Sequence, residues 1–291
     1  MARHDSLAAI SNPLINPKQL LAFQQQHQPQ PEADTAIFKL SLLTQTAGVL
    51  LRLPQEVIAT SIVVLQRYIT ASTTEIDSDL SLTRADFTPT SPLIQSSSAS
   101  LYLTAKQSFY PLSPRSIINA YALLTSPSTS PLPLINPSAI SLATSAAPPT
   151  PHAHFVTEGT YLARLATLFT TEQYILTTLS FSTTVTLPHP LALTYLQSLS
   201  ATPPALASRT LSHLNAALLS PQLLYLTHQP PALAVAAIYL SARELGIPLV
   251  DDEVPWWEVF DVGREELGFL VLSLASLDGF VVALRENPAW I

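Results

Sequence analysis

The 291-residue chain contains no cysteine and only six glycines. Without cysteine, disulfide bonds, thiolate nucleophiles and cysteine zinc sites are excluded, and a reducing intracellular compartment suits such a chain. None of the glycines stands in a GxGxxG, GxxxxGK[ST] or GxSxG pattern, and no HExxH is present. These absences exclude the common phosphate-binding loops, the serine-hydrolase turn and the zinc-protease helix. We therefore expect no cofactor and no metal site.

Charged residues are also scarce, at 11% of the chain, with 13 basic residues against 20 acidic ones. A protein that binds DNA or RNA normally has a basic patch, because much of its affinity comes from contacts to phosphates. A net charge of −7 argues against such a patch. We expect no direct nucleic-acid partner.

Neither a secretory signal nor a membrane span is expected. Residues Met1 to Asp5 lead into no long apolar segment, so the usual form of a signal peptide is missing. The best candidate for a span, Leu267 to Leu284, is interrupted by Asp278 and two serines. A carboxylate at the centre of a bilayer costs about 2.5–3.5 kcal/mol on insertion scales. We predict that this run is a buried helix, and we expect no membrane partner.

Proline is abundant, with 26 residues, and apolar residues make up 47% of the chain. The apolar residues recur at helical spacing, and prolines such as Pro54, Pro114 and Pro204 stand at segment starts, where a missing N–H has little cost. The only alternating stretch, Thr184 to Leu187, is too short to carry a sheet. The sequence therefore predicts an all-α fold, with helices near residues 36–50, 55–68, 97–106, 114–124, 158–179, 190–199, 204–219, 231–245, 254–260 and 265–284.

Polar, proline-rich segments divide this helical pattern. Residues 24–31 are predicted to form a solvated linker, and residues 77–92 and 126–151 to form long loops rich in Ser, Thr and Pro. The domain prediction is an N-terminal extension and linker over residues 1–33, a first lobe over 34–187 and a second lobe over 188–291. Two successive sets of about five helices suggest duplication of one helical unit.

Several aromatic and histidine residues invite a functional interpretation but favour a structural one. Trp256 and Trp257 are expected to pack the second lobe, since aromatic side chains mostly serve burial. His152 and His154 resemble a metal pair, but their loop supplies no carboxylate and little outer support. No triad spacing connects the remaining candidates, His189, His213 and His228. We predict no catalytic residue and no small-molecule substrate.

Two charged residues interrupt apolar helical stripes. Glu172 stands where its helix should present a core residue, and a buried carboxylate must be paired or hydrogen-bonded. Lys106 ends the apolar stripe that contains Tyr102 and Leu103. Two interpretations are open. Lys106 favours the negative end of its own helix while Glu172 points to solvent, or the two residues form an exposed charged pair, ringed by apolar side chains, that receives a partner.

Four segments resemble the cyclin family, and in particular transcription-type cyclins such as cyclin L and cyclin Q. They are, in the order found in that family, GVLLRLPQEVIAT at 48–60, LTAK at 103–106 with SPRSIIN at 113–119, EQYILTTLSF at 172–181 and PWWEVF at 255–260. The resemblance covers residues 36–285, which is most of the chain.

This resemblance implies two tandem cyclin boxes of about five helices each, and a subunit that is not itself an enzyme. Lys106 and Glu172 match the lysine–glutamate pair that contacts the kinase, and three residues match apolar positions around that pair, namely Leu103, Leu176 and Phe181. The implied partner is a cyclin-dependent serine/threonine kinase that controls RNA polymerase II transcription in the nucleus. The regulatory subunit activates such a kinase by binding its active arrangement more tightly than the inactive one.

The chain also departs from the family pattern. Gln107 and Ser108 stand where many cyclins have acidic residues, which puts the choice of kinase in doubt. The recruitment patch of cell-cycle cyclins has no counterpart on the first helix, and this favours a transcription-type member. Two alternatives stay open: a cyclin-fold general transcription factor or adaptor without kinase activation, and a helical enzyme. A promoter-binding factor needs a basic face and an enzyme needs polar residues on facing helices, of which only Glu172 qualifies.

Overall fold

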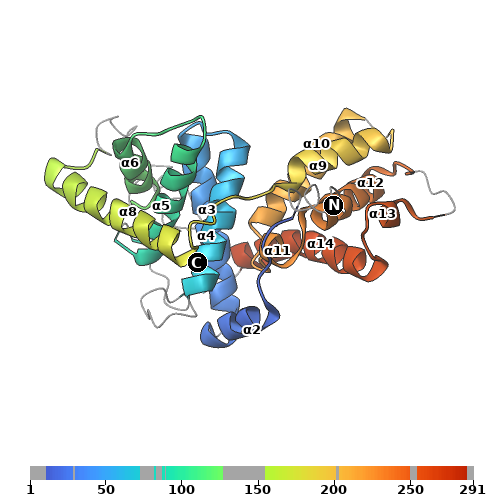
Figure 1. Ribbon diagram of the computed structural model, residues 1–291, viewed down its shortest axis with the longest axis horizontal. Coiled ribbons are helices and arrows are strands. Elements are labelled where there is room, and N and C mark those ends of the chain that lie inside the picture. Colours follow the sequence, from blue (N-terminus) through green and yellow to red (C-terminus); the bar gives the residue numbers. More distant parts are fainter. Residues whose placement is uncertain are drawn as a thin grey trace, which may run out of the picture. The chain divides into compact units, whose positions relative to one another are not determined.

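The computed structural model describes residues 11–28, 30–72, 82, 87–88, 90–126, 155–200, 203–249 and 254–286. Within these ranges the regular elements are helices and none is a strand (Figure 1). The predicted all-α class is therefore confirmed. Most of the loops predicted over 77–92 and 126–151 lies outside the described residues, as do His152 and His154.

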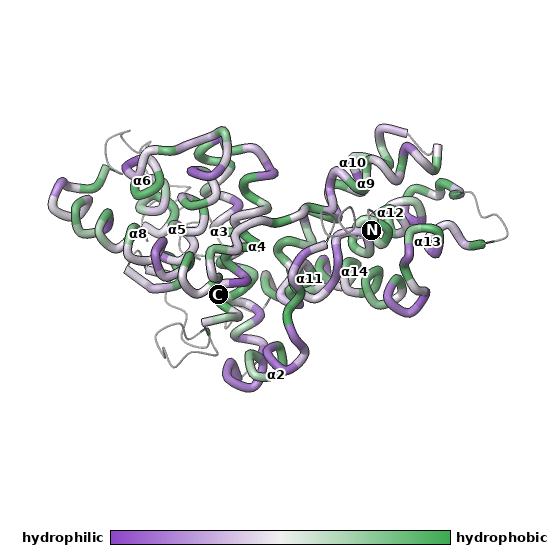
Figure 2. Tube along the Cα trace, in the orientation of Figure 1, coloured by the Kyte–Doolittle hydropathy of each residue, from purple (hydrophilic) through white to green (hydrophobic). Residues whose placement is uncertain are grey.

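The chain divides into two compact units. The N-terminal unit comprises residues 16–184 together with 284–291, and the C-terminal unit comprises residues 1–15 and 185–283. Figure 2 shows apolar stretches along the helices of both units, as expected for two separate cores.

The N-terminal unit is built around one central helix, α5. Its helices are α2 (Pro17–Gln26), α3 (Gln30–Leu50), α4 (Gln55–Ser72), α5 (Pro92–Gln107), α6 (Pro114–Leu124) and α8 (Glu158–Thr178). Helix α5 contacts α3, α4, α6 and α8. Its apolar side chains are accordingly buried on several sides, including Leu93, Leu101 and Leu103. Each buried leucine contributes about 1.5–3 kcal/mol, so the helix that carries Lys106 is firmly held.

Local signals explain where these helices begin. Asn16 and Gln19 form a capping box at the start of α2, and Ser113 caps α6 directly before Pro114. Each cap satisfies backbone N–H groups that have no partner within the helix.

The prediction that residues 24–31 form a linker is wrong for most of these residues, which are helical. Helix α2 continues to Gln26 and α3 begins at Gln30. Between them, His27 is only 3% exposed, and its ring Nδ1 lies 3.0 Å from the carbonyl oxygen of Phe23. The proline that suggested a break, Pro31, falls in the first turn of α3, where its missing N–H would have no helical partner.

A glycine sets the close approach of α3 and α4. A Cβ atom at Gly48 would lie 2.5 Å from Cγ1 of Ile58, far closer than two carbon atoms can approach. The junction that follows turns through Arg52, whose φ is 58°. Gly48 begins the first of the cyclin-like segments, and only a residue without a side chain fits between α3 and Ile58 at this position.

The C-terminal unit has α12 at its centre. Its helices are α9 (Pro188–Ser198), α10 (Pro204–Leu218), α11 (Leu224–Thr227), α12 (Pro230–Leu245), α13 (Trp256–Val259) and most of α14 (Arg264–Glu286). Helix α12 contacts α9, α10 and α11. Residues 232–238 are all buried, because other helices of the unit pack around this part of α12.

Residues 11–15 are tied to the C-terminal unit and do not form a free extension. The Asn12 side chain donates to the carbonyl of Thr186 and accepts from its N–H, both at 2.8 Å. The Asn12 backbone exchanges two further bonds with the Gln229 side chain, at 2.9 and 3.1 Å. Asn12 is 6% exposed, and buried bonds of this kind are costly to lose. The segment predicted as residues 1–33 is thus shared between the two units.

The tryptophan pair packs the C-terminal unit, as predicted. Trp256 is 5% exposed and meets the rings of Trp257 and Phe260 edge to face, with centroids 6.0 and 6.2 Å away. Among the described residues, no group of three His, Asp or Glu side chains is placed to hold a metal ion. The histidines have structural partners instead: His189 bonds Asn215, and His213 bonds Glu244.

Helix α14 is less buried than its sequence predicted. By length and composition, residues 264–284 could cross a membrane, and one third of the most apolar window is buried within the protein. The buried side chains follow helical spacing at Leu267, Leu270, Leu274 and Leu277. The opposite face is exposed, and Leu272 is 73% accessible. The prediction of a buried helix therefore holds for one face only, because no described helix of the unit covers the other face.

Candidate functional site

Helices α5 and α8 bring Lys106 and Glu172 together. The two helices pack against each other in the N-terminal unit, and the Lys106 ammonium donates to Oε1 of Glu172 in an ion pair. Lys106 lies in the last turn of α5, where a positive charge also favours the negative end of the helix. The pair joins residues that are 66 positions apart in the chain.

The two ends of this ion pair differ in burial. The Glu172 side chain is 8% exposed, whereas the Lys106 side chain is 49% exposed. Of the two sequence interpretations, the one that pointed Glu172 to solvent is therefore wrong. The other agrees with the structure in that the Lys106 ammonium reaches the surface; that the pair receives a partner stays a prediction. An ammonium has three donors, so Lys106 can bond Glu172 beneath it and also an acceptor on an approaching surface.

Aromatic rings continue the site along the α5–α8 contact. The Lys106 ammonium lies 5.1 Å from the centroid of the Tyr102 ring, in cation–π range. The Tyr102 ring in turn lies 6.1 Å from the ring of Phe169. Tyr102 is 9% exposed and Phe169 45%. The ammonium thus lies against the partly desolvated ring of Tyr102, and this lower local polarity strengthens its electrostatic interactions.

Sequence reasoning missed two exposed aromatic residues that follow Lys106 by three and four positions in the chain. Phe109 and Tyr110 follow Lys106 in the short connection to α6, and they are 99% and 53% exposed. Fully exposed phenylalanine is unusual on a free surface, because its burial contributes about 1.5–3 kcal/mol. The sequence did contain a signal for them, because two adjacent aromatic residues stand between Ser108 and Pro111, in a short connection between helices that contributes no side chain to the core.

Phe181 projects from the end of α8 in a strained conformation. The helix ends with two residues in the left-handed region, Ser180 at φ 49° and Phe181 at φ 62°. The N–H groups of Phe181 and Ser180 donate to the carbonyls of Leu176 and Thr177, at 2.8 and 3.0 Å. This is the Schellman ending, in which glycine normally takes a left-handed position. Ser180 takes that position, and Phe181 after it is left-handed as well. Each such non-glycine residue costs about 1–2 kcal/mol, and the Phe181 side chain is 70% exposed.

The predicted site residues therefore have three different environments. Lys106 and Phe181 are exposed, Leu176 is half-buried, and Glu172 is buried below the lysine. Leu103 is only 2% exposed, so it packs within the unit and supports α5 from the inside. What the structure brings together is an exposed ammonium, a buried carboxylate beneath it and the rings of Tyr102 and Phe169 beside it.

This geometry was compared with known proteins. No family model matches the chain. A search of curated proteins finds the cyclin L homolog cyl-1 of Caenorhabditis elegans, 29% identical over 127 residues. That match covers 42% of this chain and 25% of the cyl-1 sequence. The matched part thus corresponds to about a quarter of the length of this curated relative.

A search of solved structures gives a much longer match. A chain in the crystal structure of the yeast RNA Pol II CTD kinase CTDK-1 complex superposes with a TM-score of 0.59 and 15% sequence identity. The match covers 91% of this chain and 72% of the other, so it extends over both units. At this identity the likeness establishes the fold. Together with the cyclin L match, it confirms the resemblance of this chain to transcription-type cyclins.

Proposed function

We propose that this chain is a cyclin-type regulatory subunit that binds and activates a cyclin-dependent kinase acting in RNA polymerase II transcription. The observation that carries the proposal is the Lys106–Glu172 pair, whose ammonium is half exposed while its carboxylate is buried. Phe109 and Phe181 of the same unit are 99% and 70% exposed, so apolar rings are available there as anchors. Apolar anchors around a few polar contacts are typical of energetic hot spots.

In this proposal the subunit acts by position and supplies no catalytic group. Phosphoryl transfer requires a lysine–glutamate pair and metal-binding loops to be correctly placed inside the kinase. Lys106 would donate to backbone carbonyls of the kinase, held in place by Glu172 below. Leu176 and Phe181 would contact apolar side chains, while Leu103 keeps α5 rigid. Tighter binding to the active arrangement than to the inactive one then shifts the kinase toward activity.

In this proposal the two cyclin boxes run over residues 34–187 and 188–291, and each lies mostly within one of the two units. The partner and the nuclear location rest on the names of the similar proteins, a cyclin L homolog and a chain of an RNA Pol II CTD kinase complex. The alternative is an adaptor or transcription factor with the same fold that activates no kinase. The net charge of −7 opposes the version that binds promoter DNA.

Purification of the tagged chain from native extract tests this function. We expect mass spectrometry to find a cyclin-dependent kinase in about equal amount, and the complex to phosphorylate an RNA polymerase II C-terminal repeat peptide. The isolated chain is expected to phosphorylate nothing. Recovery of promoter-binding proteins without a kinase would favour the alternative, and phosphorylation by the isolated chain would overturn the regulatory role.

A further inference from the structure

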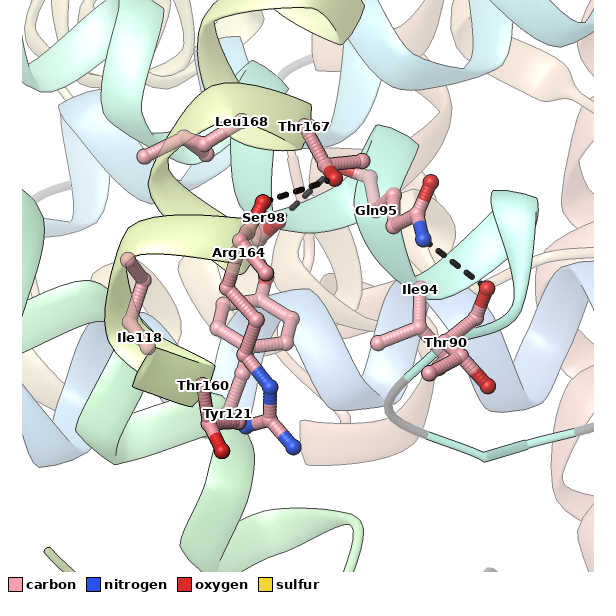
Figure 3. Close-up of a pocket in the computed structure, with 11 residues that line it drawn as sticks. Thr90, Ile94, Gln95, Ser98, Ile118, Tyr121, Thr160, Arg164, Thr167 and Leu168 are labelled. Carbon is pink, nitrogen blue, oxygen red and sulfur yellow. Dashed lines mark hydrogen bonds between the residues drawn. The ribbon is translucent and has the colours of Figure 1, made fainter. Parts of the chain in front are cut away.

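Helices α5, α6 and α8 enclose a cavity of about 210 Å³ within the N-terminal unit. Figure 3 shows its lining residues. The apolar walls come from Ile94, Ile118, Leu168 and the ring of Tyr121. The hydroxyl of Tyr121 is bonded to Ser97 at 2.6 Å, so the ring serves the cavity mainly as an apolar surface. This cavity is separate from the Lys106–Glu172 pair, although both lie along the contact of α5 with α8.

Most polar groups around the cavity have already used their donors. The hydroxyl of Ser98 donates to the carbonyl of Gln95 at 2.9 Å, and that of Thr167 donates to the carbonyl of Ala163 at 3.0 Å. The Gln95 amide donates to the carbonyl of Thr90 at 2.8 Å. These groups can still accept hydrogen bonds, and the Gln95 amide has a second N–H. All three are neutral, however, so a ligand that needs charged donors must find them elsewhere.

Arg164 supplies those donors. In Figure 3 its side chain extends toward the same end of the cavity as Thr160. Within the part of the chain that the structure describes, the Arg164 guanidinium has no ion pair and no hydrogen bond. Burial lowers the pKa of Arg164, with no nearby carboxylate to offset it. A guanidinium nevertheless stays charged, so the cavity holds a half-buried cation that has no counter-ion among the described residues.

The neighbouring arginine shows the contrast. Arg115 of α6 is paired with Glu158 at 2.7 Å, which raises the pKa of its guanidinium, and it lies 4.2 Å from the centroid of the Tyr161 ring. Its charge and its planar face are both occupied. Arg164 is therefore the guanidinium of this region that has donors available for a ligand.

We propose that this cavity is a binding site for a small organic carboxylate. The carboxylate would form a bidentate pair with Arg164, and the apolar body would lie between Ile118, Leu168 and the Tyr121 ring. A guanidinium matches a planar carboxylate in both geometry and charge. The volume is below that of pockets for drug-sized ligands, so the ligand has a single ring or a short chain. This inference does not depend on the proposed kinase partner.

Benzoate is the probe for this site, and benzamide is its neutral counterpart of the same shape. Titration of the full chain, followed by amide chemical shifts, is expected to give a Kd for benzoate on the order of a millimolar, as usual for a fragment of this size. Benzamide should bind at least tenfold more weakly. Equal affinities for the two probes, or no saturable binding of benzoate, would overturn the proposal.

Three variants locate the binding. Arg164→Gln removes the charge and should weaken benzoate at least tenfold. Ser98→Leu keeps Arg164 but fills the cavity from α5, and it should abolish binding of both probes. Arg115→Gln removes a paired arginine nearby and should leave both affinities unchanged. Wild-type benzoate affinity in Arg164→Gln or in Ser98→Leu, with the circular dichroism spectrum preserved, would contradict the site.

Discussion

Replacing Lys106 with alanine is expected to weaken binding of the proposed kinase partner by roughly 30- to 1,000-fold, which corresponds to about 2–4 kcal/mol. Two losses combine in this variant. The kinase loses a hydrogen-bond donor, the Lys106 ammonium that lies over the Tyr102 ring. In addition, the Glu172 carboxylate, 8% exposed in the free chain, stays unpaired beneath the interface. An unpaired charge at a buried interface accounts for much of the cost when one partner of a pair is truncated.

Isothermal titration or surface plasmon resonance against the purified kinase measures this effect. The matched control is Arg115→Ala, which removes a basic residue from the same unit. Its pair with Glu158 is exposed at both ends, 50% and 67%, and such pairs contribute little. The control should change affinity by less than threefold. If Lys106→Ala binds as tightly as the control, the pair does not face the kinase.

Because Glu172 is buried, the stability of variants of the pair distinguishes a binding role from a purely structural one. Lys106→Ala should lower the free energy of unfolding by about 1–3 kcal/mol, because a buried acceptor loses its partner. Glu172→Gln removes the charge with little change in shape and should lower it less. If Glu172→Gln unfolds the chain, as judged by circular dichroism, the pair is structural and the interface interpretation fails.

Replacing Phe181 with glycine is expected to raise stability and lower affinity at the same time. Phe181 has φ 62°, a conformation that glycine adopts without the steric cost of a side chain. Relief of this strain, offset by the greater freedom of glycine in the unfolded chain, should stabilise the fold by about 0.5–1 kcal/mol. The exposed ring is lost as an anchor, and kinase affinity should fall about thirtyfold, or about 2 kcal/mol.

Ser180→Gly provides the matched control for this prediction. Ser180 is also left-handed, with φ 49°, but it has no large side chain to offer a partner. This variant should gain stability by a similar amount and keep its kinase affinity. Chemical denaturation and titration of both variants give the comparison. Equal affinities for the two variants would show that the strained ring has no role in binding.

The helices of both units could be predicted from sequence because local signals and tertiary packing agree. The start of α6 follows almost directly from Pro114 behind Ser113. The buried position of α12 follows in the same way from its apolar residues 232–238. The predictions that failed depend on tertiary context. Whether residues 24–31 form a linker depends on where Pro31 falls in the helix, and the outer face of α14 depends on which helices cover it.

The site was predictable in part. Glu172 was found because a carboxylate broke an apolar stripe, and Lys106 because it ended one; the resemblance to cyclins then matched both to a kinase contact. The difference in burial between the two ends of the pair depends on side-chain packing, which no spacing rule gives. Phe181 could be named from the resemblance, but its left-handed backbone could not, because helices with this ending usually signal it by glycine. Phe109 and Tyr110 have no periodic signal, since they lie between helices.

Hydrogen exchange of the chain with and without the kinase tests the central claim most directly. Amide exchange reports local opening, and a covered surface exchanges more slowly. We expect protection on complex formation at residues 106–113 and 176–183, and no change at the turn of residues 219–223 in the C-terminal unit. Protection confined to the C-terminal unit, with residues 106–113 and 176–183 unchanged, would contradict the proposed interface.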